Sequence, residues 1–361
     1  MLLFFYHNGL PIYRTKEGEM KRIKVGIPRA LLYYKFADMW ETFFRQLGAQ
    51  VVVSPLTTKR IKEEAVKIAP NEDCYSTKLY FGHVLALKDK VDYLFIPRFG
   101  GYRKNYVSCP KLIGLAEVLK SIIPDLPPII MPHYNRGKGR DTKLSFLIKA
   151  YLTGMRLTKN PLKIAEAIFK AIKTHKKHLR SLILTEEGLT KWEKSEIVIN
   201  DPPKVIENEK QLKIALVGHL YVINDPYASL DIRTILQQHG LDIITSEQIP
   251  RKVVEEQMAK LEYDYYFEYT REILASVMYF LESKTVDGII HIMIFSCGPD
   301  SIAGDLAARF SKRNPAVPLL QLVFDELTGE AGLRTRIEAF VDMLRRRRMK
   351  EQPMFQTKMH V

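Results

Sequence analysis

The sequence alternates short apolar, strand-like segments with amphipathic, helix-like segments along most of its length. Segment 21–28 (KRIKVGIP) is strand-like, and a helical pattern over 30–47 follows it, closed by Gly48 at a position where glycine commonly ends helices. Strands separated by helices of this length form right-handed βαβ units, and therefore a mostly parallel sheet with helices on both faces. The other strands expected in this half are 49–55, 91–98 and 127–134, and the other helices are 58–68 and 111–122.

The second half repeats this alternation. Strands are expected at 212–219, 241–246, 286–297 and 317–326, and helices at 229–239, 251–260, 267–282, 301–311 and 329–345. Residues 143–195 have a helical pattern, and 195–211 contains Asn-Asp-Pro-Pro and a charged cluster typical of a linker. We therefore expect an α/β protein with two Rossmann-like or flavodoxin-like parallel-sheet domains joined by a helical segment. The expected parts are an N-terminal hairpin (1–20), a first α/β domain (21–142), a helical connector and linker (143–211), a second α/β domain (212–345) and a basic C-terminal tail (346–361).

Composition narrows the function classes. The chain has 361 residues, 46% of them hydrophobic, and no apolar run approaches the length of about 20 residues that a membrane span needs. The apolar N-terminus lacks the basic region and cleavage site of a signal peptide, which favours a cytoplasmic protein. The net charge of +14 is spread widely, and the densest basic runs, 170–180 and 345–350, contain no aromatic residues. This pattern favours solvated helix faces, or docking of an acidic or phosphate-bearing partner, over nucleic-acid binding.

The chain contains three cysteines, Cys74, Cys109 and Cys297, and no CxxC pair. An odd number at this low density argues against a disulfide framework. Cys297 directly follows an expected strand and precedes Gly-Pro-Asp, Cys109 is followed by a proline and an expected helix, and Cys74 lies near the expected start of a third helix. Backbone N–H groups at a helix start stabilise a thiolate, which is the form that binds metals.

These positions leave three interpretations of the cysteines open. Scattered cysteines are often core residues, because a free cysteine packs like a small hydrophobic side chain. A Cys3His zinc site in a zinc-stabilised structural protein would be completed by His83, His133 or His219, although zinc sites usually contain closely spaced ligand pairs. An iron–sulfur cluster normally takes four cysteines, so three would leave one iron for water, substrate or another ligand.

Several motifs, in the same order, resemble those of the 2-hydroxyacyl-CoA dehydratase and benzoyl-CoA reductase superfamily. They are NEDCYSTKLYFGHV (71–84), YLFIPR (93–98), SCPKLIG (108–114), FSCGPDS (295–301) and FDELTGEAGLRTRIEAF (324–340). The segment 218–247 (GHLYVINDPYASLDIRTILQQHGLDIITSE) resembles the superfamily's branch of acyl-CoA dehydratase activase-related proteins, also called CoA protein activases. The resemblance extends from Lys24 to about Leu344.

The resemblance implies an anaerobic protein whose 4Fe-4S cluster is bound by Cys74, Cys109 and Cys297, with the remaining iron open to water or substrate. It implies an ATP-hydrolysing activator iron–sulfur protein as partner and acyl-CoA thioesters as candidate substrates, in low-potential electron transfer, radical dehydration or reduction. It also implies a homo- or heterodimer, and a double-cubane cluster would need two chains to share their cysteines. The alternative to an enzyme is a non-catalytic electron carrier or cluster-assembly partner of the activator.

Candidates for acid–base chemistry also lie near these motifs. Glu72 lies two residues before the first cysteine, and Asp325 and Glu326 end the last expected strand. Asp300 and Ser301 are expected to cap the helix that follows the third cysteine.

The segment 99–108, which leads to the second cysteine, contains two glycines and the cations Arg103 and Lys104. It suits either a lid over an anionic ligand or a solvated loop.

Overall fold

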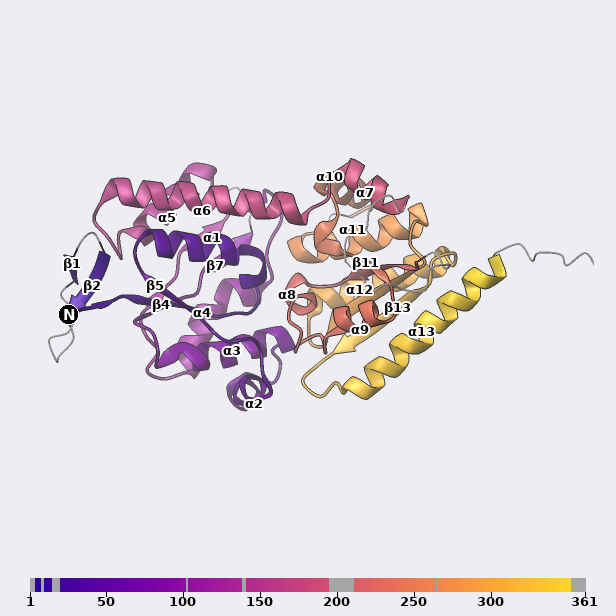
Figure 1. The fold of residues 1–361 in the computed structure, drawn as a ribbon, viewed down its shortest axis with the longest axis horizontal. Helices are drawn as coiled ribbons and strands as arrows, with labels where there is room; N and C mark the ends of the chain where they lie inside the picture. Colours follow the sequence, from indigo (N-terminus) through magenta and orange to yellow (C-terminus); the bar gives the residue numbers. More distant parts are fainter. Residues whose placement is uncertain are drawn as a thin grey trace, which may run out of the picture.

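The computed structural model describes residues 4–7, 10–14, 20–101, 103–137, 141–194, 211–263 and 265–351. Two four-stranded sheets, parallel throughout, lie in two lobes side by side (Figure 1). This architecture confirms the predicted α/β fold with two parallel-sheet domains. Within the described ranges, none of the helices combines the length and apolar character of a membrane-spanning segment.

The sheet of the first lobe has the strand order β5-β4-β6-β8. Its strands are β4 (Lys24–Ile27), β5 (Gln50–Val53), β6 (Tyr93–Phe95) and β8 (Ile129–Ile130), and its helices are α1 (Tyr33–Gln46), α2 (Lys59–Ile68), α3 (Tyr75–Lys88) and α4 (Pro110–Ile122). Helix α1 ends before Gly48, whose φ of 93° is the left-handed conformation that glycine adopts readily. Helix α2 begins after Thr58, whose hydroxyl accepts a hydrogen bond from the amide of Ile61.

The sheet of the second lobe has the same kind of order, β11-β10-β12-β13. Its strands are β10 (Lys213–Val217), β11 (Asp242–Thr245), β12 (Gly288–Ile294) and β13 (Leu319–Phe324), and its helices are α8 (Leu220–Ile223), α9 (Ile232–Gln238), the 3-10 turn η1 (Ser246–Gln248), α10 (Arg251–Met258), α11 (Glu268–Ser283), α12 (Gly298–Arg313) and α13 (Glu330–Glu351). In each sheet the first strand in sequence lies between the second and the third. Ligands of such flavodoxin-like sheets bind beyond the carboxyl ends of the strands, where the order reverses.

Three helices follow the first sheet: α5 (Lys143–Gly154), α6 (Pro161–Leu182) and α7 (Glu186–Glu193). Helix α6 packs along α1 and extends toward the second lobe (Figure 1). Most of the expected linker, 195–210, lies outside the described residues. At the N-terminus, β1 (Phe4–His7), β2 (Leu10–Arg14) and β3 (Met20–Arg22) form an antiparallel sheet. Helix α13 continues to Glu351, into the range that was expected to be a tail.

Two expected strands are shorter than the sequence pattern suggests. Residues 91–98 and 127–134 each divide at a proline, Pro97 and Pro132, because proline donates no ladder hydrogen bond. The segments beyond these prolines, β7 (Arg98–Gly101) and β9 (His133–Asn135), pair in a separate parallel two-stranded sheet. Part of the segment expected as a loop, 99–108, is therefore a strand.

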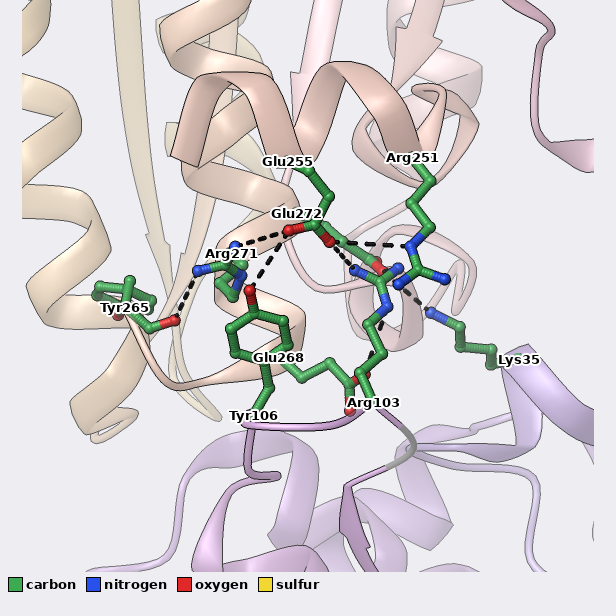
Figure 2. Close-up of polar contacts among 9 residues, drawn as sticks. All are labelled: Lys35, Arg103, Tyr106, Arg251, Glu255, Tyr265, Glu268, Arg271 and Glu272. Atoms are coloured by element: carbon green, nitrogen blue, oxygen red, sulfur yellow. Dashed lines mark hydrogen bonds and ion pairs between the residues drawn. The ribbon is translucent and has the colours of Figure 1, made fainter. Parts of the chain in front are cut away.

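An ion-pair network joins this segment to the second lobe (Figure 2). Arg103 is buried, and its guanidinium lies 3.2 Å from Glu255 of α10 and 3.5 and 3.3 Å from Glu268 and Glu272 of α11. Lys35 of α1 also pairs with Glu272, at 3.4 Å. Of the two alternatives left open for this segment, the solvated loop is wrong at Arg103, because three carboxylates from the other lobe surround its charge.

Candidate metal centre

Each of the three cysteines is the N-cap residue of a helix. Cys74 precedes α3, Cys109 precedes α4 and Cys297 precedes α12, and a proline occupies the first turn of the last two helices. None of these three sulfurs caps its helix through a hydrogen bond. The first-turn N–H groups of a helix attract negative charge, so each sulfur stands where a thiolate is stabilised. The prediction that the cysteines lie at helix starts is confirmed.

Two polar contacts connect the loops that carry the cysteines. The hydroxyl of Ser296, beside Cys297, donates a hydrogen bond of 2.8 Å to the carbonyl oxygen of Glu72, two residues before Cys74. The ammonium group of Lys111, two residues after Cys109, pairs with the carboxylate of Asp73. Residues one or two positions from the cysteines therefore connect the loops of Cys74 and Cys109 in the first lobe to each other and to the loop of Cys297 in the second lobe.

Burial sets the protonation of two of the thiols. Cys74 and Cys297 are 9% and 7% exposed and belong to one hydrophobic cluster, whereas Cys109 is half-buried. Burial raises the pKa of Cys297, and the neighbouring carboxylate of Asp300 raises it further. Burial also raises the pKa of Cys109. Without a bound cation, Cys297 and Cys109 are therefore neutral thiols at pH 7, and a metal that binds them must displace their protons.

Tyr221, just beyond β10, lies among the cysteines. Its pKa is raised well above the usual value, first by burial and then by the negative charge that Cys297, Cys74 and Cys109 would carry as thiolates. The ring stacks on the imidazole of His219, with 4.8 Å between ring centroids and 9° between planes. The phenol of Tyr221 and the imidazole of His219 thus stack on each other beside Cys297, whose sulfur lies 3.8 Å from His219 Nε2.

His219, Cys297 and Asp300 form a compact buried group. Their ligand atoms lie within 4.8 Å of one another, with 3.8 Å from His219 Nε2 to the sulfur and 4.0 Å to the carboxylate. His291 approaches the same carboxylate at 3.6 Å. Burial lowers the pKa of His219, which leaves its imidazole neutral at pH 7, the form that binds metals. Because β10 and β12 are neighbours at the point where the strand order reverses, their ends bring His219 and Cys297 together.

The spacing of the donor atoms separates two kinds of metal group. Ligands of a single ion lie close together, whereas each iron of a cluster takes its own ligand, so the sulfurs around a cluster are more widely spaced. Among the described residues, the compact group includes one cysteine, Cys297. By the chemistry of the donors, three soft sulfurs at three helix starts fit an iron–sulfur cluster, while the compact His219–Cys297–Asp300 group fits a single ion.

The other histidines considered for a zinc site lie elsewhere. His83 of α3 is buried, with Nδ1 2.9 Å from the hydroxyl of Ser54 and Nε2 2.9 Å from that of Thr57. His133 is exposed on β9. Of the three, His219 is the one placed beside a cysteine.

Of the three candidates for acid–base chemistry, Asp325 and Glu326 have side-chain partners. Glu72 is exposed, and its backbone carbonyl accepts the bond from Ser296. Asp325 accepts hydrogen bonds from the amide of Leu327 and the hydroxyl of Thr328, which closes a turn after β13. Glu326 pairs with Lys78 of α3 at 2.6 Å and so contributes to the contact between the lobes.

The expectation that Asp300 and Ser301 cap the last of the three helices is wrong, because α12 begins three residues before Ser301. The carboxylate of Asp300 instead accepts a hydrogen bond of 2.8 Å from the amide of Ile294, at the end of β12, and the hydroxyl of Ser301 donates to the carbonyl of Cys297. Asp300 thereby fixes the turn that presents Cys297.

Two residues of the site, Tyr221 and His291, were not predicted. A signal for them existed, because β10 and β12 were expected as parallel strands and residues just beyond or within adjacent strands become neighbours. The short helix α8, which carries Tyr221, has no clear sequence signature in its four residues.

Two protein-family models match the chain. The family model described as the CoA enzyme activase uncharacterised domain matches residues 24–249, well over half of the chain, and includes Cys74 and Cys109. A second model, the D-component of 2-hydroxyglutaryl-CoA dehydratase, matches residues 226–344 and includes Cys297. No curated protein sequence matches the chain. The three cysteines thus divide between the two matched regions, and the chain belongs to the family of the CoA enzyme activase uncharacterised domain, within the superfamily of the 2-hydroxyacyl-CoA dehydratases.

Proposed function

We propose that Cys74, Cys109 and Cys297 bind one 4Fe-4S cluster, and that the protein acts in low-potential electron transfer or radical chemistry on acyl-CoA thioesters. The observation that carries this proposal is that the three cysteines each precede a helix, and that contacts between the adjacent residues join their loops at the meeting of the two lobes. When bound, such a cluster supplies one-electron transfer and, with three cysteine ligands, an iron that is open to another ligand.

The surrounding residues would prepare the site for this role. The first-turn amides of α3, α4 and α12 would stabilise three thiolates. Burial of Cys74 and Cys297 excludes water, which protects a low-potential group. Tyr221 stays protonated because its pKa is raised, so its hydroxyl is available as a hydrogen-bond donor near the sulfurs.

The family match supports the expected partners. An ATP-hydrolysing activator would deliver the electrons, since the matched family is described as a CoA enzyme activase domain. The similarity to the D-component of 2-hydroxyglutaryl-CoA dehydratase supports an acyl-CoA thioester as substrate and a homo- or heterodimer as the working form. We place the protein in the cytoplasm, where such an activator finds ATP.

A second candidate rests on the compact group of His219, Cys297 and Asp300. One nitrogen, one sulfur and one oxygen donor within 4.8 Å suit a single zinc ion. In that case the protein would be zinc-stabilised and would have no redox role at this site.

Metal analysis separates the two candidates. After anaerobic purification, a cluster gives iron and acid-labile sulfide in equal amounts, whereas the second candidate gives about one zinc per chain and no sulfide. A His219→Ala variant sharpens the comparison, because it retains iron and sulfide if the cysteines hold a cluster and loses zinc if His219 is a ligand. A zinc-containing protein without sulfide would refute the proposed cluster.

The choice between enzyme and carrier needs a separate assay. Turnover of 2-hydroxyacyl-CoA thioesters is measured with the activator, ATP and a reductant, and a product would establish the enzyme. Oxidation of the reduced protein by a second protein, without thioester turnover, would establish the non-catalytic electron carrier instead.

A further inference from the structure

Helices α5 and α6 carry an apolar surface that faces solvent. On α5, apolar residues recur every three or four positions, the spacing of a helix stripe that is normally turned to the core. Here the stripe is exposed, and Leu162 and Phe169 of α6, which are 81% and 67% exposed, continue it. We call this the α5–α6 surface, and its main residues are Leu144, Ile148, Leu152, Met155, Leu162 and Phe169.

A shallow groove runs along this surface. Leu147, Ile148 and Tyr151 of α5 form one wall, and Phe169 and Ile172 of α6 form the other. The two helices are joined by six residues, and they pack against each other as a helical hairpin. A groove between two such helices accepts the apolar face of a third helix, as in small helical bundles and helix-in-groove complexes.

The charge around the groove indicates what kind of helix fits. Residues 143–180 contain ten lysines or arginines and one acidic residue, Glu166, which already pairs with Lys170 at 2.6 Å. Several of these cations are exposed beside the apolar stripe: Lys143, Arg156, Lys159, Lys173 and Lys176. A second copy docked through the same surface would bring like charges together, which is unfavourable.

We propose that the α5–α6 surface is a docking site for an acidic amphipathic helix of a partner protein. The helix would place its apolar face in the groove and its Asp and Glu residues against the flanking lysines and arginines. Apolar burial would supply the affinity, and the charges would supply orientation and speed of association. The proposal goes beyond the cluster chemistry and does not depend on it.

The test uses two synthetic peptide helices with the same leucine face, one flanked by glutamates and the other by lysines. Binding of each labelled peptide to the full chain is followed by fluorescence anisotropy at low and high salt. We expect the acidic peptide to bind, to weaken as salt screens the charges, and to bind at least about tenfold more tightly than the basic one.

Phe169→Asp places a charge in the groove and should weaken the acidic peptide by about tenfold or more. The matched control is Met349→Asp on α13, which changes a side chain of similar exposure, 62%, also among basic residues. This control should bind the acidic peptide as the wild type does. Circular dichroism of both variants verifies that the fold is retained.

Three results would overturn the proposal. The first is that the acidic peptide binds Phe169→Asp as tightly as the wild type, or binds neither protein. The second is a dimer in sedimentation that the Phe169→Asp substitution dissociates, because a second copy would then be the occupant of the groove. The third is binding of phosphatidylglycerol vesicles to the wild type but not to Phe169→Asp, because the surface would then be a lipid-binding site.

Discussion

At the scale of single residues, the cysteines occupy positions where other side chains would stabilise the helices better. Serine, threonine, aspartate and asparagine are preferred at the N-cap, and replacing one of them typically costs about 1 kcal/mol of stability. The chain places cysteine there before α3, α4 and α12, and none of these sulfurs caps its helix. Stability that is forgone three times at one place is consistent with a ligand role for these sulfurs.

The buried side chain of His83 makes the stability of the fold depend on pH. Its pKa is lowered to about 4, first by burial and then by the charge of Arg29, whereas the ordinary value is 6.5. Between these pH values the unfolded chain binds a proton that the folded chain does not. The neutral His83 therefore contributes fully to the stability of the fold above pH 6.5, and this contribution is lost as the pH falls from 6.5 toward 4.

We expect the free energy of unfolding to fall by about 2 kcal/mol between pH 7.5 and pH 5 because of His83 alone. Urea unfolding at both pH values measures this, and His83→Gln should remove that part of the pH dependence. An equal pH dependence in wild type and His83→Gln would contradict the expectation.

The positions of the cysteines could be predicted from the sequence, because Cys109-Pro and Cys297-Gly-Pro-Asp are local signals of a helix start. The partners of His219 could not be chosen in the same way. Three histidines were equally plausible neighbours of the cysteines, and the choice depended on which strands lie side by side. The strand order is a property of the whole sheet and leaves no local mark on His219.

At the scale of elements, helix α3 depends on a close approach to α2. A Cβ added to Gly82 would collide with the backbone oxygen of Ile61 and lie 2.8 Å from its Cγ2 atom. Glycine at this position therefore allows the two helices to pack, and it sets the position of the helix that Cys74 begins. In α4, by contrast, a Cβ added to Gly114 would have no atom within 4 Å.

Alanine at these two glycines should have opposite effects. We expect Gly82→Ala to lower the free energy of unfolding by about 1–3 kcal/mol, because the helices must move apart. Gly114→Ala should raise it by about 0.5–1 kcal/mol, because alanine favours a helix and meets no obstacle. Urea unfolding followed by circular dichroism compares them, and a loss at both positions would be the contrary result.

The pattern of strands and helices was predictable wherever apolar periodicity was strong, as in β4, α1, β12 and α11. It failed where prolines intervened, since 91–98 and 127–134 each became two short strands, in different sheets. The pairing of β7 with β9 depends on hydrogen bonds between segments far apart in sequence, such as that from the amide of Arg98 to the carbonyl of Pro132. Local propensity contains no information on such a pairing.

At the scale of the whole molecule, the contact between the lobes determines whether the cysteines meet. Cys74 and Cys109 belong to the first lobe, and Cys297 belongs to the second. Arg103 is central to this contact (Figure 2), with three glutamates of the second lobe around its buried guanidinium. Removing a buried cation from such a group costs more than the pair contributes, since the carboxylate of Glu268, whose side chain is fully buried, keeps its charge away from water.

We expect Arg103→Met to lower the free energy of unfolding by about 3–5 kcal/mol and to increase hydrogen exchange in 99–108. Arg309→Met, which removes an exposed pair with Asp305 on α12, should change the stability by less than about 1 kcal/mol. Similar small effects of both substitutions would show that the network contributes little to joining the lobes.

The most direct measurement is the iron and sulfide content of the anaerobically purified chain, together with the EPR spectrum of its reduced form. The wild type should contain about four iron and four sulfide atoms and give a cluster signal, which Cys74→Ser, Cys109→Ser and Cys297→Ser should each remove or strongly reduce. Ser301→Ala, beside the site on α12, should retain both the iron and the signal. A wild type without sulfide, or an unchanged spectrum in all three cysteine variants, would contradict the cluster.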